Sequence, residues 1–496
     1  MSYKKNLFKH STHYFIGEIL VILASVISFP ILTRIFSKEQ YGQMSLISVL
    51  LGLGVTFANG GFQQSTVRFF NEFSQNKRKC GVNVFYSTFF WASLILSLFV
   101  MTGIILLSFF LPDSTFSLGT KKIVRFTAII IVFQTLNKLF LSFYRSEQKT
   151  ILYNLCYIGK QYLSLGGSLA LIFFVVANLY SLYTGIIVAE GIFVIFFIFA
   201  FMYKKKVNFY FFSKSFLKEA VFFGFPFMFL NSAFLLFDSG DKYIIQYYKG
   251  FEAVGIYSVG YSLSSYVQSA IVTPFNMAIG PLCMEIWVKH GKEATSRFLS
   301  EVLYYFIAVS GLTVLILVSI RKEILIVLAS TKFAEAHVVV PFVIIGVMLY
   351  GIYNIFARVL FIYKKIILLP IGILLSAVLN IVLNVFLIPI WGIVGAAVAT
   401  LFSYMFLVFS TYLITSKYMK IEFPWAIIIK CSIVALCSHF FLLRVHLFSG
   451  SKLIIIIIKT VILMVIYSGA IVLVDEKIRN LIGKLFKTLL DKINHR

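Results

Sequence analysis

Residues 31–45 read ILTRIFSKEQYGQMS, a short polar segment between two long apolar runs. Residues 246–260 read QYYKGFEAVGIYSVG, and the pattern Glu-x-x-Gly-x-x-Ser that begins at Glu39 begins again at Glu252. Glycine permits the tight turn that joins two helices, because it has no side chain to clash in a left-handed conformation. We therefore expect each copy to form the return between the first and second helix of a repeated unit, with its glycine at the turn.

The apolar runs around these segments recur along the whole chain. Of the 496 residues, 60% are hydrophobic and only 13% are charged, and the mean hydropathy is +0.94. Soluble domains are far less apolar. Runs of about 20 apolar residues, the length that crosses a bilayer as a helix, predict an all-α polytopic membrane protein with about 14 transmembrane helices. The first run is followed at once by another, which favours a retained helix over a signal peptide.

The repeated polar segment belongs to a longer internal repeat. TLNKLFLSFYRSEQKTILY at 135–153 resembles GIYNIFARVLFIYKKIIL at 351–368, and YTGIIVAE at 183–190 resembles IVGAAVAT at 393–400. Matches in one order at offsets of roughly 210 to 217 residues predict two homologous lobes of about six helices each. An even number of helices per lobe gives both lobes one orientation, so that they are related by an axis along the membrane normal.

The repeat sets the expected domain boundaries. We expect an N-terminal lobe over residues 1–206 and a C-terminal lobe over residues 207–416, joined at the lysine-rich segment 204–218. Residues 417–496 would add two helices and a basic tail. In transporters with this plan the substrate path lies between the lobes.

The charge balance indicates orientation rather than nucleic-acid binding. The chain carries 44 Lys and Arg against 19 Asp and Glu, a net charge of +25. These cations are dispersed through short loops instead of forming one basic face, so no nucleic-acid partner is expected. Most of them fall on the side of the N-terminus, which by the positive-inside rule places both termini in the cytoplasm.

Cysteine and histidine patterns give no sign of a metal or cofactor. The five cysteines form no CxxC pair and the seven histidines no HExxH motif. We expect no disulfide framework, no metal site, no cofactor and no catalytic residues.

Charged residues inside the apolar runs are the strongest candidates for function. A charge at the bilayer centre costs about 2.5–3.5 kcal/mol on insertion scales, so it usually faces a partner or a wet cavity. The expected cationic cavity, suited to a phosphate or pyrophosphate, consists of Arg34, Arg68, Lys138, Lys160, Lys242 and Arg358. The candidates for binding a coupling H+ or Na+ are Glu18, Glu190, Asp238 and Asp241. Further polar lining is expected from Asn354, Asn380 and Asn384.

A structural reading competes for several of these residues. Arg68, Lys430 and Lys459 stand where a long side chain can reach the headgroups, and this snorkelling explains them without a function. Asp241 adjoins Lys242 and is explained as well by structural pairing.

Five segments together resemble the polysaccharide transporter family, which includes the flippases of bacterial O-antigen and capsule repeat units. The resemblance extends over nearly the whole chain. The segments read PILTRIFSKEQYGQMS at 30–45, ANGGFQQSTVRFFNEF at 58–73, GFPFMFLNSAFLLFDSGDKYII at 224–245, EAVGIYSVGYSL at 252–263 and LNIVLNVFLIPIWGIVGAAVAT at 379–400.

The resemblance implies a fold, a location and a substrate. The fold is that of the multidrug and oligosaccharidyl-lipid exporter superfamily, in the bacterial cytoplasmic (inner) membrane. The substrate is an undecaprenyl-pyrophosphate-linked oligosaccharide, moved to the outer leaflet by ion-coupled alternating access, with a polysaccharide polymerase and glycosyltransferases as possible partners. The family's recurrent cations fall on Arg34, Arg68 and Lys242. Lys242 stands where the family often has Arg, and a lysine, unlike an arginine, cannot form a bidentate contact with phosphate.

Two alternatives stay open. An ion-coupled multidrug exporter of the same superfamily would need an acidic cavity for cationic drugs. A membrane polymerase or glycosyltransferase of the same pathway would need acidic residues or a large outer loop, and the short loops of this sequence do not favour it.

Overall fold

The regular structure of the described residues is entirely helical. The computed structural model describes residues 2–75, 81–112, 116–203, 207–444 and 451–484, so parts of the predicted linker and basic tail lie outside it. Its α-helices are α1 (Ser2–Ile35), α2 (Lys38–Asn59), α3 (Phe62–Ser74), α4 (Val82–Phe110), α5 (Leu118–Thr127), α6 (Ile129–Ser146), α7 (Thr150–Phe174), α8 (Leu179–Tyr203), α9 (Lys214–Ser239), α10 (Asp241–Val267), α11 (Thr273–Ser319), α12 (Arg321–Ala329), α13 (Val340–Ile362), α14 (Leu369–Ser416), α15 (Trp425–Arg444) and α16 (Lys452–Val474).

The described residues form fourteen long helical stretches when the longest helices are divided at their breaks. Ten candidate spans meet the length and hydropathy needed, and two of them are much longer than a bilayer, at 106 and 51 residues. The longer one is broken at Gly250 and Gly291, and the other at Gly392, where φ is 81°, 72° and 57°. Dividing the two spans there and adding the 25-residue α7 gives fourteen. The predicted number of helices is confirmed, and the protein is a multi-pass membrane protein.

The chain forms two compact units that are described separately. The first comprises residues 1–258 and 377–396, and the second comprises residues 259–376 and 397–496. The lobe boundaries expected at residues 206 and 416 stay a prediction.

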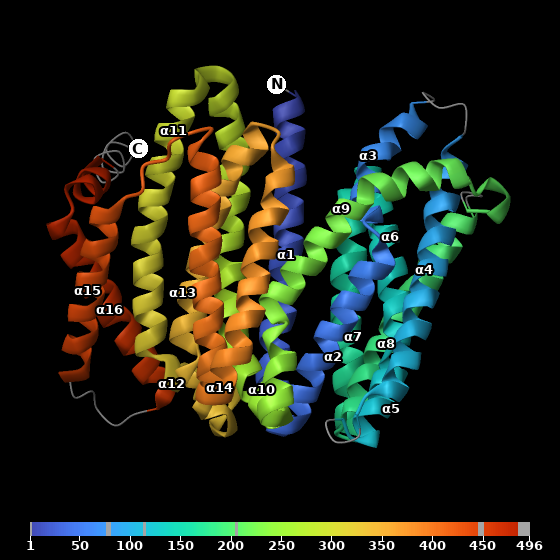
Figure 1. The fold of residues 1–496 in the computed structure, drawn as a ribbon, viewed down its shortest axis with the longest axis horizontal. Coiled ribbons are helices and arrows are strands. Elements are labelled where there is room, and N and C mark those ends of the chain that lie inside the picture. Colours follow the sequence, from blue (N-terminus) through green and yellow to red (C-terminus); the bar gives the residue numbers. More distant parts are fainter. Residues whose placement is uncertain (1, 76–80, 113–115, 204–206, 445–450, 485–496) are drawn as a thin grey trace, which may run out of the picture. The chain divides into compact units, whose positions relative to one another are not determined.

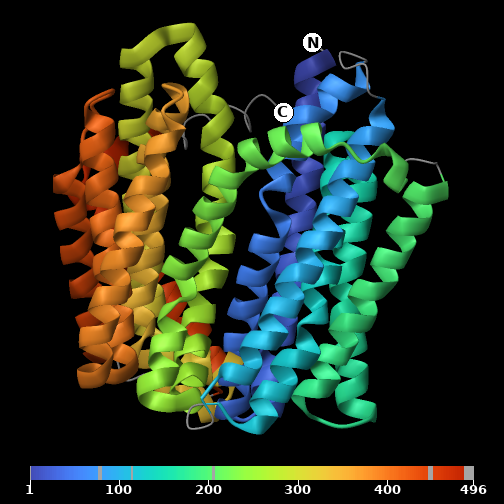
Figure 2. The same ribbon diagram turned by 45° about the vertical axis from the view of Figure 1, so that its right-hand side comes forward.

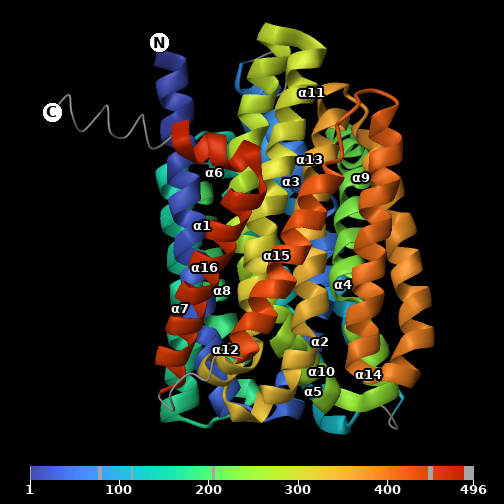
Figure 3. The same ribbon diagram turned by 90° about the vertical axis from the view of Figure 1, so that its left-hand side faces the viewer.

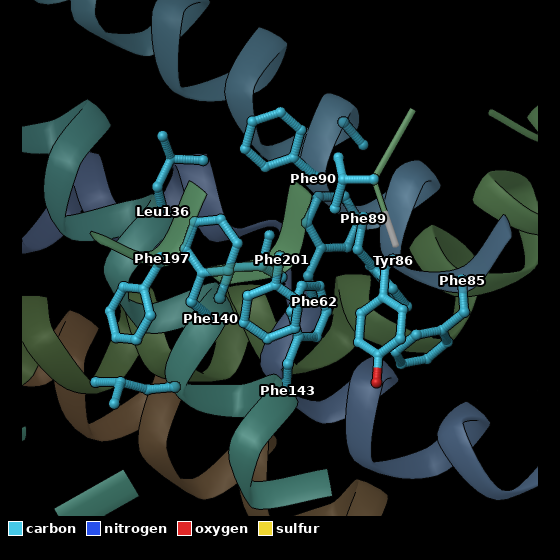
Figure 4. Close-up of a cluster of buried hydrophobic side chains, with 14 of the residues drawn as sticks. Phe62, Phe85, Tyr86, Phe89, Phe90, Leu136, Phe140, Phe143, Phe197 and Phe201 are labelled. Carbon is cyan, nitrogen blue, oxygen red and sulfur yellow. The ribbon is translucent and has the colours of Figure 1, made fainter. Parts of the chain in front are cut away.

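A large aromatic cluster holds the first unit together. Figure 1 and Figure 2 show α4, α6 and α8 standing side by side, and the cluster fills the space between them with side chains that Figure 4 shows in close-up. Phe140 of α6 stacks on Phe197 of α8 with ring centroids 5.2 Å apart, and Tyr86 of α4 meets Phe143 edge-on at 4.9 Å. Offset and edge-to-face aromatic pairs add stability beyond their buried area. The cluster therefore fixes α6 relative to α8.

α7 and α8 form a close helical hairpin, and α1 packs along α7 (Figure 3). A Cβ added to Gly185 of α8 would lie 2.3 Å from the backbone nitrogen of Ser168 in α7. The Ser168 hydroxyl donates a hydrogen bond of 2.8 Å to the Leu182 carbonyl. Small residues at such contacts let helix backbones approach closely within a membrane.

The turn after α6 has the same geometry as the turn after α13. Gln148 and Lys364 have φ of 57° and 56°, and they are 216 positions apart (148 to 364). In both turns the next residue donates its N–H to the carbonyl five positions earlier, at 2.9 and 2.8 Å. Two non-glycine residues in a left-handed conformation at matched positions support the internal repeat.

The expected role of the joint glycines is wrong. The turn before α2 is capped by Ser37, whose hydroxyl accepts from the Gln40 backbone while the Gln40 side chain accepts from the Ser37 backbone. In the second copy the chain turns at Gly250. Gly42 and Gly255 instead lie within helices and are buried. Polar capping groups satisfy the exposed N–H groups of the helix end, so the following glycine is free for packing.

Polar contacts join the C-terminal helices of the second unit to α11 and α12. Asp475, which ends α16, accepts hydrogen bonds from Lys430 of α15 at 2.9 Å and from the Tyr304 hydroxyl of α11. Lys459 forms an ion pair with Glu323 at 2.5 Å. Lys430 and Lys459 therefore have carboxylate partners within the protein, and the snorkelling interpretation of these two residues stays a prediction. Apolar surroundings make a carboxylate a better partner for an ammonium group than a distant headgroup.

The Asp475 contacts predict a loss of stability in acid. Burial alone would raise the pKa of this carboxyl, but hydrogen bonds from Tyr304 and Lys430 outweigh burial and hold the pKa below the ordinary value of 3.8. A lowered folded-state pKa stabilises the fold above the unfolded pKa, and this contribution is lost as the pH falls through the folded pKa. We expect the thermal unfolding temperature of the purified protein to fall below about pH 4.

The Asp475→Asn variant tests this dependence. It should unfold at a lower temperature than the wild type at pH 7 and show a smaller decrease in acid. Glu476→Gln, at the exposed neighbouring position, is the control. An Asp475→Asn protein with the acid profile of the wild type would contradict the assignment.

Candidate functional site

A buried polar cluster lies between α6, α7 and α8 in the first unit. The Lys160 Nζ of α7 lies 3.1 Å from the Oε1 of Glu190 in α8. The Asn137 amide of α6 donates to the other carboxylate oxygen of Glu190 at 2.5 Å and to its backbone carbonyl at 3.0 Å. The Lys160 and Glu190 side chains are 13% and 5% exposed, and Asn137 is fully buried. Burial strengthens each of these interactions and makes the loss of one partner expensive.

Lys138 adds a second positive charge beside this cluster. It is half-buried on α6 and close enough to interact electrostatically with both Lys160 and Glu190. Across the described ranges no carboxylate lies within ion-pair distance of it. Two ammonium groups and one carboxylate leave a net charge of +1, which an anion or a change in protonation would offset.

The cluster has no charged counterpart in the second half of the chain. The positions 216 residues after Lys160 and 210 residues after Glu190 are Ser376 and Thr400, both buried. Charge therefore distinguishes the two halves of the repeat at this place.

Arg358 lies on α13 in the second unit and is also half-buried. Its Nη2 donates to the Asn276 carbonyl at 2.9 Å, and its guanidinium lies against Gly280, where an added Cβ would come within 3.2 Å of Nη1. Its Nε is buried with no partner among the described residues. A buried guanidinium N–H without a hydrogen-bond partner costs free energy, so the Arg358 Nε is suited to donating a hydrogen bond to an oxygen of a ligand.

Arg34 and Arg68 are exposed. Arg34 donates to the Pro30 carbonyl of its own helix at 2.8 Å. Arg68 forms an ion pair with Glu72 one turn away at 3.2 Å. Exposed pairs of this kind contribute little stability. The snorkelling reading of Arg68 and the predicted cavity role of both arginines stay predictions.

The acidic candidates of α9 and α10 gather around Lys242. Asp238 and Asp241 both interact with it electrostatically. The Asp241 carboxylate, which is 1% exposed, also accepts a hydrogen bond from the fully buried Tyr257 hydroxyl. Asp241 therefore interacts with groups on both sides of the break at Gly250, and its structural pairing with Lys242 stays a prediction.

The other candidates differ in their remaining hydrogen-bonding capacity. Glu18 is half-buried on α1 near Tyr157 of α7. The Asn354 amide donates to the Tyr350 carbonyl of its own helix at 2.8 Å. Asn384 donates to both the backbone and side-chain oxygens of Asn380 at 2.9 Å. The Asn380 amide nitrogen and the Asn384 amide oxygen have no partner in the part of the chain that is described.

The structure thus brings Lys138, Lys160 and Glu190 together, as residues of one cluster in one unit. It places Arg358 and Asn354 in the second unit. The sequence analysis did not identify Asn137. This residue is next to Lys138 in the sequence but lies on a different face of the same helix. Over the described residues no three His, Cys, Asp or Glu side chains gather in an arrangement that could hold a metal ion.

Comparison with solved structures identifies the fold. The lipid II flippase MurJ in its inward closed conformation aligns over 96% of this chain and 100% of its own, with a TM-score of 0.71 at 17% identity. The eukaryotic MATE transporter AtDTX14 aligns over 88% and 100%, with a TM-score of 0.59 at 13% identity. A mutant of the Vibrio cholerae MATE transporter VcmN aligns over 84% and 97%, with a TM-score of 0.54 at 12% identity.

Sequence comparison identifies the family. No curated protein matches the chain. The family model described as "Polysaccharide biosynthesis protein" matches residues 7–287, which is more than half of the 496 residues. This protein is therefore a member of the polysaccharide biosynthesis protein family, and it has the fold shared by MurJ and the MATE transporters.

Proposed function

We propose that this protein is a flippase that moves undecaprenyl-pyrophosphate-linked oligosaccharide repeat units from the cytoplasmic to the outer leaflet of the bacterial cytoplasmic membrane. The observation that carries the proposal is the net positive cluster of Lys138, Lys160, Glu190 and Asn137 in a member of a polysaccharide biosynthesis family. A lysine held in an apolar setting binds a phosphate more strongly than it would in water. The polyprenyl tail would stay in the bilayer while the headgroup crosses.

In this proposal the two lobes, residues 1–206 and 207–416, alternate between inward-open and outward-open states. Arg358 would supply the cation of the C-terminal lobe, and its free Nε would take a pyrophosphate oxygen. Glu18, Glu190, Asp238 and Asp241 are the candidate sites for the coupling H+ or Na+. Among them the carboxylates of Glu190 and Asp241 are buried. An ion that binds one state better than the other shifts their populations by its difference in affinity.

The function is tested by locating the lipid-linked oligosaccharide in a strain that lacks the gene. Complete repeat units should accumulate on the cytoplasmic leaflet, and the intact gene should restore their appearance outside. Single units already on the outer leaflet would place the block at polymerisation and overturn the proposal.

A second candidate is an ion-coupled multidrug exporter, which the shared fold with the MATE transporters favours. Drug sensitivity of the deletion strain with normal surface polysaccharide would support this reading. Glycan elongation by the purified protein would instead support the polymerase or glycosyltransferase alternative.

Neutralising the proposed phosphate ligands should impair translocation without preventing membrane insertion. We expect Lys138→Gln and Arg358→Gln each to lower the rate about tenfold or more, since a hydrogen bond to a charged group contributes about 1.5–3 kcal/mol. The measurement is outward movement of the lipid-linked oligosaccharide, normalised to the amount of folded protein in the membrane. Lys214→Gln, at the exposed start of α9, should match the wild type. Normal rates in both cavity variants would exclude a cationic cavity.

A further inference from the structure

An apolar furrow follows α2 and α4, which pack side by side in the first unit (Figure 2). It consists of two cavities of about 910 and 190 Å³, both lined entirely by residues of this unit. The two cavities share Leu50, Ile104 and Leu107 as lining residues, so they meet along one furrow. The larger cavity reaches Gly60 at one end of α2, and the smaller one reaches Gln43 near the other end.

One face of each helix lines the furrow. On α2 the lining residues recur every three or four positions, as at Leu46, Leu50, Leu53 and Phe57. On α4 they recur every four positions, as at Ile95, Phe99, Gly103 and Leu107. Residues at this spacing lie on the same side of a helix, so each helix presents a continuous stripe.

The furrow is nearly as long as the hydrocarbon core of a membrane is thick. The α2 stripe extends from Gln43 to Gly60, which at about 1.5 Å per residue is roughly 26 Å. The hydrocarbon core is about 30 Å thick, and a phospholipid acyl chain occupies only one of its two leaflets. A surface of this length suits a single chain that extends through both leaflets.

The lining offers hydrocarbon and no charge. None of the described residues that line the furrow is charged. Its polar side chains have partners within the protein. The Gln43 amide donates to the Thr120 hydroxyl at 3.3 Å, and the Tyr243 hydroxyl donates to the Leu46 carbonyl at 3.2 Å. The Ser108 hydroxyl donates to a carbonyl of its own helix at 2.6 Å. A ligand in the furrow would therefore be held by van der Waals contacts, which favours a hydrocarbon chain.

The furrow is open along its side. Ile95 and Phe99 of its α4 wall are 57% and 73% exposed, and Phe225 of its α9 wall is 50% exposed. Gly103 adds width, because a Cβ there would meet nothing within 4 Å. This glycine has no positive φ and admits no neighbouring helix. The space beside it is available to a ligand that enters from the bilayer.

We propose that this furrow between α2 and α4 binds the polyprenyl tail of the lipid-linked oligosaccharide while its headgroup crosses the membrane. The inference rests on the proposed function. The tail must move from one leaflet to the other with the headgroup, and an apolar surface through both leaflets keeps it in contact with protein throughout. Lipid is as apolar as the furrow, so packing and the displacement of phospholipid chains must retain the tail. Binding should therefore depend on the length of the tail.

Photo-cross-linking tests the assignment. Residue 103 is replaced by p-benzoylphenylalanine in the full chain, which is reconstituted in phosphatidylglycerol vesicles that contain a known mole fraction of undecaprenyl phosphate. Mass spectrometry then measures the polyprenyl and phospholipid adducts. We expect polyprenyl adducts at residue 103 to exceed the mole fraction of this lipid roughly tenfold. Excess unlabelled undecaprenyl phosphate should reduce the adducts of an isotope-labelled probe, whereas farnesyl phosphate, with the same headgroup and a shorter tail, should not.

The matched control carries the same photoreactive residue at position 166. Gly166 is an exposed glycine of α7 at which an added Cβ would also meet nothing within 4 Å. Its adducts should follow the bulk lipid composition. The furrow assignment would be overturned by adducts at residue 103 that follow the bulk composition, by the absence of adducts there, or by equal competition from farnesyl phosphate.

A filled furrow gives a second readout. Gly103→Phe should lower outward movement of the lipid-linked oligosaccharide roughly tenfold without lowering the unfolding temperature, because the added side chain meets open space. Gly166→Phe should match the wild type. Unchanged movement in Gly103→Phe would overturn the assignment. If the wild type moves no oligosaccharide, the proposed function fails, whereas tail-length-dependent adducts at residue 103 would still support the furrow as a polyprenyl site.

Discussion

The Glu190→Ala variant should lose about 3–5 kcal/mol of folding free energy, the usual cost of removing one partner from a buried ion pair. The substitution leaves the Lys160 ammonium in an apolar setting without its carboxylate, and the Asn137 amide keeps only its bond to the backbone carbonyl. Thermal unfolding of the detergent-solubilised protein should show a lower transition temperature. The yield of monodisperse protein should fall as well.

The double variant Lys160→Met/Glu190→Leu is the control for this prediction. It removes both charges and replaces them with apolar groups of similar volume, a change that is often neutral or stabilising for a buried pair. We expect it to regain most of the wild-type unfolding temperature but not the translocation activity. A Glu190→Ala protein as stable as the wild type would show that the pair is solvated and not buried.

Gly61→Ala should destabilise the protein by about 2–5 kcal/mol, through two separate effects. Gly61 has φ of 78°, a left-handed conformation that strains any side chain, and it precedes α3. A Cβ there would also lie 1.9 Å from the Gly224 carbonyl oxygen of α9. Neither backbone can yield easily, because the Ser65 hydroxyl ties α3 to the Ala220 carbonyl at 2.8 Å. The measurement is again the unfolding temperature of the purified protein.

Gly103→Ala provides the comparison. Gly103 lies within α4, its φ is not positive, and an added Cβ would meet nothing within 4 Å. Alanine is favoured over glycine in a helix by up to about 1 kcal/mol, so this variant should be equal to or slightly more stable than the wild type. If Gly61→Ala and Gly103→Ala unfolded at the same temperature, the Gly61–Gly224 contact would be unimportant.

Sequence reasoning predicted the helical fold and the number of helices because both depend on local properties. A run of about 20 apolar residues must form a helix in a bilayer, since no water is there to satisfy its backbone groups. The α7 helix shows the weakness of this reasoning. Lys160 lowers the hydropathy of α7 enough to exclude this helix from the spans judged by composition. In the folded protein the Lys160 ammonium group is stabilised by Glu190 on the next helix.

The residues of the candidate site were largely predictable from the sequence, but their contacts with one another were not. An ionisable residue in an apolar run needs a partner, so Lys160 and Glu190 were identified. Their pairing, the part played by Asn137 and the ion pairs of Lys430 and Lys459 depend on how helices rotate against one another. Rotation is set by packing, such as the aromatic cluster of α4, α6 and α8, and hydropathy carries no information about it.

The repeated segment Glu-x-x-Gly-x-x-Ser shows most clearly which properties follow from the sequence and which follow from the tertiary structure. The sequence by itself determined that the segment occurs twice, at the same point of two related halves, and that it contains a glycine. Only the tertiary structure decided what that glycine does, because Gly42 and Gly255 lie within helices and meet the opposing backbone. The physical reason is that a turn is fixed by local dihedral angles, whereas a close approach is fixed by residues 213 positions away (42 to 255).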